Sequence, residues 1–497
     1  MDSFPITGLR GGPPSRKALE GMDTRCKRMP ENEEPCHRLY QQLIFLHDFV
    51  LPLKAEDPSK RQYIDVIVRL IKIMRRTPLL LRLANSEALM QNLKVLQLQL
   101  DQVQKDIGQG TPDMTLREEQ WDNDRAQQYQ KLQERVPKAS DRMLVNEVRG
   151  DRKLQEALMT LFDGVKWDGQ SPEMVTLKQE TFDRVSRYAQ LTGLQMFAWF
   201  IPIDNVEYED EVIGERGTFG DVCRGTWMTK GKRLNVVVKR LFPELSANSD
   251  QDFLRQLELW SSIPEDRHIL KLFGGSHVSS PQFYVCEDAH NGSLDEFLEG
   301  NSEFFWQMFL DVAEGIKVLH SRNIFHGGLK CSNILVGADY TAKLTDFGFS
   351  SVRSLSAGLS EQSAKAAGQS IRWKPKEVLE EVGDEEPQYA SDIYSLGMCM
   401  IEALSREPPF GMNDEPDVME FIMQGKMPDK PEDVSGDTWD LITRISCTNP
   451  KKRLSLDEVL MEFGARAAEE RKLHPVPRPV MLEPVLYLNG NIHSRQK

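Results

Sequence analysis

The feature that most constrains this chain is an ordered series of short motifs between residues 214 and 348. A glycine-rich segment, GERGTFGDV, comes first, and the β-branched run VVVK, which ends in Lys239, follows it. HGGLKCSN and then DFG come later, and they contribute Asn333 and Asp346. Glycines let backbone amides approach phosphates, a lysine neutralises them, and carboxylate and carboxamide oxygens suit Mg²⁺. The series therefore predicts a site for a nucleotide and a metal ion.

The order of the motifs resembles that of the protein-kinase superfamily, in which H-R-D-L-K-x-x-N precedes D-F-G. The resemblance covers residues 205–465 and implies an α+β, bilobal kinase fold, with a small β-rich lobe before a large helical lobe. Short β-branched runs such as NVVVK and QFYVC agree with that order, because they precede the mostly helical pattern after residue 302. The phrase HGGLKCSNIL, with Arg372-Trp373-Lys374 before Glu377, is similar to the tyrosine-kinase-like group.

The resemblance assigns nucleotide binding to the small lobe and to the hinge after it. Lys239 is expected to clamp the phosphates, Val237 to face the adenine, and Cys286 to act as the gatekeeper. The backbone of Glu287 and Ala289 is expected to hydrogen-bond to the adenine. The full predicted nucleotide site consists of Ile213, Gly217, Gly220, Val222, Val237, Lys239, Cys286, Glu287 and Ala289.

Two small-lobe positions depart from the family pattern. In the glycine-rich loop, either Glu215 replaces the first glycine or one residue is inserted after Gly214. On the helix that should supply a glutamate partner for Lys239, the aligned residue is Gln256, and Glu258 points away from that face. We therefore expect a neutral contact in place of the Lys–Glu ion pair.

The catalytic loop carries the decisive departure. His326, Lys330 and Asn333 are present, and Asn333 with Asp346 is expected to bind Mg²⁺. Gly328 replaces the aspartate that orients the substrate hydroxyl and accepts its proton, and glycine has no side chain for either task. Because acid–base groups contribute roughly 10²–10⁴ in rate, we expect a large loss of activity.

A second change in this loop concerns regulation. Gly327 replaces the arginine that would pair with a phosphorylated activation loop. Position 327 therefore has no cation that could bind a phosphorylated serine between Ser350 and Ser363. The large-lobe frame is better kept: Glu377 is expected to pair with Arg453, and Asp392 to anchor the catalytic-loop backbone.

The residues before the kinase region show helical periodicity. One apolar stripe contains Leu39, Leu43, Leu46 and Val50, a second contains Tyr63, Val66, Ile67, Leu70, Ile71 and Met74, and a third contains Leu89, Leu93, Leu96, Leu100, Val103 and Ile107. We predict a flexible arm over 1–35, an all-α helical bundle over 36–110, a helical connector or brace over 111–200, and a disordered tail over 466–497. The front end loosely resembles the bundle and brace of mixed-lineage-kinase-domain-like proteins.

Composition excludes several other classes. The net charge of −14 argues against general nucleic-acid binding. The seven cysteines form no C-x-x-C pair, so we expect neither zinc nor a disulfide framework. The N-terminus lacks an apolar signal region, and no apolar run of about 18 residues occurs. A reducing compartment, cytosolic or nuclear, fits these observations, a cytoplasmic location is expected, and the oligomeric state stays open.

Three functions fit these observations. The first is a pseudokinase, or a severely impaired Ser/Thr kinase, that binds ATP and Mg²⁺ and acts as a switch or scaffold for its helical domain. The second is a low-activity Ser/Thr kinase with protein substrates, which Lys330 favours. The third is a membrane- or partner-binding helical effector that uses a basic side formed by Arg61, Arg69, Lys72, Arg75 and Arg76, although a solvated helix face explains these cations more simply.

Overall fold

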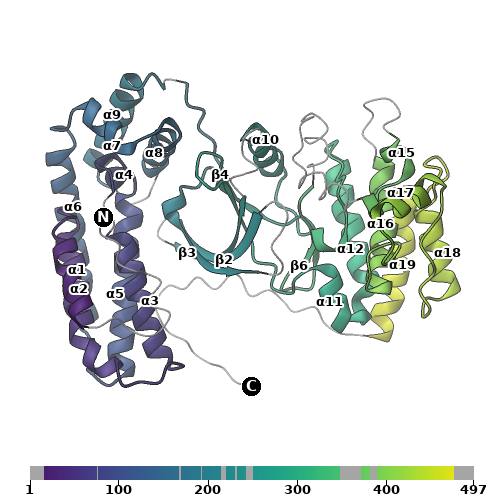
Figure 1. The fold of residues 1–497 in the computed structure, drawn as a ribbon, viewed down its shortest axis with the longest axis horizontal. Coiled ribbons are helices and arrows are strands. Elements are labelled where there is room, and N and C mark those ends of the chain that lie inside the picture. Colours follow the sequence, from purple (N-terminus) through teal and green to yellow (C-terminus); the bar gives the residue numbers. More distant parts are fainter. Residues whose placement is uncertain are drawn as a thin grey trace. The chain divides into compact units, whose positions relative to one another are not determined.

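The computed structural model describes residues 16–74, 77–166, 170–191, 193–213, 220–229, 232–241, 250–347, 371–380 and 389–474. The chain divides into two compact units near residue 206, and each is described by itself. The first is built from helices, and the second carries a β-sheet followed by helices (Figure 1). This arrangement confirms the predicted α+β class with helices in front.

The helices of the first unit start at clear sequence signals. Asp57 accepts a hydrogen bond from the Ser59 amide ahead of Pro58, and Ser171 accepts one from the Met174 amide ahead of Pro172. Proline suits the first helical position because that amide has no intrahelical partner. The helices are α1 (Arg16–Cys26), α2 (Glu33–Val50), α3 (Pro58–Ile73), α4 (Leu79–Ala84), α5 (Ser86–Asp106), α6 (Met114–Arg135), α7 (Asp141–Val148), α8 (Asp151–Gly164) and α9 (Pro172–Tyr188), and the 3₁₀ turn η2 (Ile203–Asn205) follows them.

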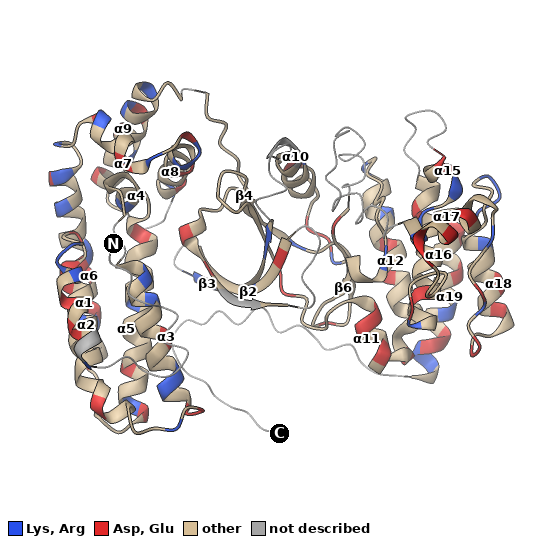
Figure 2. Cartoon of the chain, viewed as in Figure 1, with Lys and Arg blue, Asp and Glu red and all other residues tan. Residues whose placement is uncertain are grey.

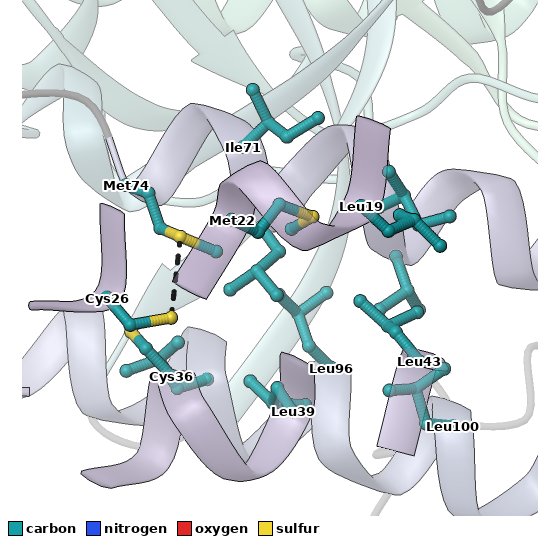
Figure 3. Packing of buried hydrophobic residues seen from close by; sticks show 14 of the residues in the cluster. Leu19, Met22, Cys26, Cys36, Leu39, Leu43, Ile71, Met74, Leu96 and Leu100 are labelled. Carbon is teal, nitrogen blue, oxygen red and sulfur yellow. Dashed lines mark hydrogen bonds between the residues drawn. The ribbon is translucent and has the colours of Figure 1, made fainter. Parts of the chain in front are cut away.

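The predicted apolar stripes of α2, α3 and α5 meet in one buried core, which Figure 3 shows in close-up. Helix α1 closes this core with Leu19, Met22 and Cys26, and the Cys26 sulfur lies 3.9 Å from that of Met74. The predicted flexible arm over 1–35 is therefore wrong from residue 16 onward. Apolar residues three and four apart form a helical stripe there, although the surrounding sequence is rich in glycine, proline and charge.

A second core joins α4 to α7, α8 and α9 within the same unit. Lys178 of α9 is fully buried beside it and donates to the Gln170 side chain at 2.7 Å. It also donates to the carbonyl of Gly164, the last residue of α8, at 3.3 Å. Burial lowers the pKa of this lysine to about 8.

The second unit begins with a sheet of strand order β1-β2-β3-β5-β4. Its strands are β1 (Val206–Val212), β2 (Gly220–Thr229), β3 (Lys232–Leu241), β4 (Leu272–Ser276) and β5 (Phe283–Cys286), and helix α10 (Asp250–Ser261) lies between β3 and β4 in the chain. Strand β3 pairs antiparallel with β5 so that Val237 faces Cys286 and Lys239 faces Tyr284. Val237 and Lys239 share one face of β3, because side chains alternate along a strand.

The helical lobe follows. In chain order its elements are α11 (Leu294–Gly300), η4 (Ser302–Phe304), α12 (Phe305–His320), η5 (Cys331–Asn333), β6 (Ile334–Val336), β7 (Ala342–Leu344), η6 (Ile371–Trp373), α15 (Lys376–Leu379), α16 (Tyr389–Ser405), α17 (Glu415–Met423), α18 (Gly436–Ile445) and α19 (Leu456–Leu473). Glu470 of α19 accepts hydrogen bonds from the amides of Trp306 and Gln307 at the start of α12, at 2.8 and 2.9 Å. A carboxylate stabilises the positive end of a helix dipole.

Helix α19 also corrects the predicted boundary of the tail. The prediction of disorder from residue 466 is wrong up to Leu473, where the helix ends, and residues 475–497 lie outside the described part. On α18 and α19 acidic and basic side chains are interspersed (Figure 2), and Arg466 pairs with Asp437 at 2.9 Å. Within the described ranges, no helix is both long enough and apolar enough to cross a bilayer.

Candidate active site

Asp392, in the first turn of α16, anchors the catalytic loop through hydrogen bonds. Its carboxylate accepts hydrogen bonds from the amides of His326 and Gly327 at 2.8 and 2.9 Å, and from the His320 ring at 2.9 Å. Asp392 is 1% exposed, so these bonds form away from water and are correspondingly strong. The structure thus places Asp392 against the loop as the sequence predicted, and adds His320 as a third donor.

Gly328 stands within this loop with space around it. The Asn333 side-chain amide donates to the Gly328 carbonyl at 2.7 Å. A Cβ atom at 328 would meet only that nitrogen, at 4.0 Å, which is ordinary contact, and the residue lies outside the left-handed backbone region. Gly327 has a φ of 69°, which side chains tolerate poorly. The loop can therefore hold a side chain at 328 but is strained by one at 327.

His326 and Lys330 flank Gly328. His326 is fully buried, its Nδ1 accepts a hydrogen bond from the Gly328 amide at 3.3 Å, and burial lowers its pKa. A neutral imidazole with Nδ1 as acceptor is therefore a structural member of the loop. Lys330 is half-buried, and its carbonyl accepts from the Asn333 amide at 2.9 Å.

Lys239 is paired with Asp346. The ammonium of Lys239 lies 2.8 and 2.6 Å from the two carboxylate oxygens. Asp346 adopts a φ of 58°, a backbone conformation that is uncommon for residues other than glycine. The expected loss of a Lys–Glu pair is thus accompanied by a new ion pair with a different acid.

Gln256 contacts the residue next to Asp346. It is 1% exposed on α10, and its side-chain amide donates to the Phe347 carbonyl at 2.8 Å. Phe347 is itself fully buried and lies edge-on to the Trp260 ring at 5.6 Å between centroids. The neutral contact expected between Gln256 and Lys239 is therefore wrong: Gln256 donates to the Phe347 carbonyl, its Oε1 atom has no hydrogen-bond partner, and the Lys239 ammonium binds Asp346.

The predicted adenine site lies along β3, β5 and the hinge. Cys286 is buried opposite Val237, and burial raises the pKa of its thiol, so the thiol is protonated. The Glu287 amide donates to the Lys271 carbonyl at 3.0 Å, and the Glu287 side chain binds Lys343 at 2.9 Å. The Glu287 amide is therefore committed to the fold, so the predicted contact with adenine would have to use the Glu287 carbonyl and the backbone of Ala289.

Of the remaining predicted nucleotide residues, Ile213 follows β1, and Gly220 and Val222 lie in the first residues of β2. The Ile213 amide donates to the Val222 carbonyl at 2.7 Å. Gly220 is buried, and a Cβ there would lie 1.9 Å from the Arg240 carbonyl oxygen, so only glycine fits this close approach of strands. Gly217 and the rest of residues 214–219 lie outside the described part, as do Gly348 and the activation-loop serines.

The donor types at Asn333 and Asp346 suit Mg²⁺, but their arrangement does not. A hard cation needs carboxylate and carboxamide oxygens. Both oxygens of Asp346 are within 2.8 Å of the Lys239 ammonium. Coordination through Asp346 would therefore place a divalent cation next to that ammonium, and the two positive charges would repel each other, so the residues as placed do not suit a divalent-metal site.

A cluster of two cysteines and a glutamate lies next to the catalytic loop. Among the described residues, the ligand atoms of Cys331, Cys399 and Glu402 fall within 4.8 Å of one another. Glu402 already accepts from the Cys331 amide at 2.9 Å and from the Trp373 ring at 2.8 Å, and burial raises the pKa of both thiols. We assign these residues to the frame that joins the loop to η6.

The large-lobe ion pair forms as predicted. Arg453 and Glu377 lie 2.9 Å apart, and the arginine side chain is 1% exposed. Arg453 also donates to the carbonyls of Cys447 and Ala390, at 2.9 and 2.6 Å. The kinase-like residues His326, Asn333, Asp346, Glu377, Asp392 and Arg453 are thus held in one connected lobe, whereas position 328 offers only backbone.

Comparison with known proteins agrees with this geometry. Ephrin type-B receptor 4b of Danio rerio is 31% identical over 249 residues, covering 48% of this chain and 25% of the receptor. Tyrosine-protein kinase ZAP-70 of Homo sapiens is 27% identical over 297 residues (56% and 47%). Probable serine/threonine-protein kinase drkD of Dictyostelium discoideum is 29% identical over 284 residues (56% and 21%). The chain spans half or less of the length of these relatives.

The same part of the chain that forms the sheet, the catalytic loop and the helical lobe also matches a family description. The match covers residues 208–463 and is to protein tyrosine and serine/threonine kinase. Fold, loop geometry and sequence similarity thus agree, and this chain belongs to the protein tyrosine and serine/threonine kinase family.

Proposed function

We propose that this chain is a protein-kinase-like signalling protein that binds ATP but transfers phosphate very slowly or not at all. The observation that carries the proposal is Gly328. The loop around it is supported by Asp392 and Asn333, yet no side chain is present where a base would act. The backbone of the catalytic loop is therefore intact around the missing base, and the site has not collapsed.

Nucleotide binding is supported by the residues that remain. Val237 and Cys286 stand opposite each other beside the hinge, and Lys239 presents an ammonium on the same face of β3 as Val237. An apolar surface for a base next to a cation for phosphates is the combination that an adenine nucleotide requires.

A switch or scaffold role for the kinase domain is supported by the helices that precede it. They form a compact unit with its own apolar cores, so nucleotide-dependent changes in the kinase domain would act on a folded partner in the same chain. The basic side of α3 offers less support for a membrane role. Arg69 pairs with Asp65 at 3.4 Å and donates to Gln99 at 2.9 Å, and Arg75 and Arg76 lie outside the described residues.

Two measurements on the full chain test the proposal. The melting temperature is expected to rise as ATP is titrated, and Lys239→Met is expected to abolish that rise. In a radiolabel assay, incorporation into a generic protein substrate is expected to stay at background.

Robust incorporation that both Lys239→Met and Asp346→Ala abolish would instead establish the low-activity kinase. A wild-type protein whose melting temperature ignores ATP would remove the nucleotide part of the proposal.

A further inference from the structure

The ion pair between Lys239 and Asp346 places an ammonium group where a kinase would be expected to hold a metal ion. Two N–O distances of 2.8 and 2.6 Å join one ammonium to both oxygens of the carboxylate. Each side chain is about a quarter exposed, so the pair is screened less than a surface pair would be. An ammonium has three donors and a full charge, so it can bind a carboxylate and still neutralise a phosphate beside it.

Gln256 explains why Lys239 turns to Asp346. A glutamine has no charge to offer the ammonium, so the carboxylate of Asp346 is the stronger acceptor. Gln256 instead donates to the Phe347 carbonyl at 2.8 Å, and thereby ties α10 to the dipeptide that carries Asp346. The other atom of its amide group, Oε1, is buried without a hydrogen-bond partner. Gln256 therefore holds the Asp346–Phe347 backbone through a single hydrogen bond.

We propose that the Lys239 ammonium takes the place of a divalent cation at Asp346, so that this kinase domain binds the phosphates of ATP without Mg²⁺. Gln256 permits this arrangement because it carries no charge and therefore does not compete with Asp346 for Lys239; its hydrogen bond to the Phe347 carbonyl is not required for it. The inference rests on the proposed nucleotide binding and specifies how that binding is regulated. The fraction of protein with bound ATP is expected to depend on the ATP concentration and not on the Mg²⁺ concentration.

The test measures the dissociation constant of a fluorescent ATP analogue for the full chain, in EDTA and in Mg²⁺. For the wild type the two values are expected to agree within about threefold, a difference of about 0.7 kcal/mol. Gln256→Glu removes the donor to Phe347 and adds a carboxylate that competes for Lys239. This variant is expected to bind at least about tenfold more tightly with Mg²⁺ than without it.

Gln256→Met is the matched control, because it removes the same hydrogen bond without adding a charge. It is expected to keep the metal independence of the wild type. If it instead became as metal-dependent as Gln256→Glu, competition for Lys239 would not be the cause, and the proposal would be overturned.

Asp346→Asn gives a second test that does not depend on α10. Because the ammonium is then released to the phosphates, affinity in EDTA is expected to hold or rise. A loss of about tenfold or more in Mg²⁺ would show that Asp346 carries the metal, and would overturn the proposal. Wild-type binding that needs Mg²⁺ would refute this inference alone, whereas no binding in either buffer would refute the proposed function as well.

Discussion

Replacing Gly328 by aspartate is expected to raise phosphotransfer activity by about 10²-fold, the lower end of the usual range for an acid–base group. The structure accommodates the change, because the new Cβ meets only the Asn333 amide nitrogen, at 4.0 Å, in a backbone region that any residue can adopt. The hydrogen bonds from the loop to Asp392 involve the amides of His326 and Gly327, so they are preserved. The lower end is expected because Asp346 stays paired with Lys239.

The assay is radiolabel incorporation by the full chain at saturating ATP and Mg²⁺. Gly328→Asn is the matched control, since it has nearly the same size without a base, and it is expected to give no gain. The double variant Gly328→Asp with Gln256→Glu is expected to exceed Gly328→Asp alone, because Asp346 becomes available to the metal. If neither aspartate variant exceeded Gly328→Asn, the missing base would not be what limits this site.

Further predictions concern stability and are checked by urea unfolding. Burial lowers the pKa of Lys178 from 10.5 to about 8, so its charge costs about 3 kcal/mol below pH 8. That cost disappears as the pH rises from 8 to 10.5, because the unfolded chain then binds more protons than the folded one. Lys178→Met is therefore expected to be more stable than wild type at pH 7 and to lose that advantage by pH 10.5; a difference that does not change with pH would contradict this account. Gly397→Ala places a Cβ 2.0 Å from the Ser446 hydroxyl and is expected to cost about 1–3 kcal/mol. Ser446→Ala removes that hydroxyl, which is buried and has no hydrogen-bond partner, and is expected to restore most of the loss; the absence of rescue would place the strain elsewhere. Arg453→Met leaves Glu377 without its cation and is expected to lower the free energy of unfolding by about 3–5 kcal/mol. Glu377→Gln in the same chain should reduce that cost, and strictly additive effects would show that the pair is not coupled.

The sequence by itself determined the kinase fold, the order of its lobes and most of the site. The order of the glycine, lysine, asparagine and aspartate residues predicts a site for phosphates and a metal ion. The replacement of the catalytic aspartate by Gly328 can also be recognised from the sequence alone. The apolar stripes of α2, α3 and α5 were equally readable, because a spacing of three and four residues directly reflects the helical repeat.

The sequence did not reveal where the arm and the tail become ordered. Helix α1 forms because Leu19, Met22 and Cys26 can be buried against α2 and α3, which is a contact between distant segments. Helix α19 continues to Leu473 because Glu470 binds the start of α12. Local composition favoured disorder in both places, and tertiary burial overrode it.

The partner of Lys239 was also decided only by the tertiary structure. The sequence showed that position 256 lacks the expected glutamate. It did not show which other acidic residue would pair with Lys239. Asp346 lies 107 residues from Lys239 in the chain and reaches the ammonium because the strand, the loop and α10 meet there. Motifs identify the groups that can take part in a site, whereas distances between remote segments decide which of them bind one another.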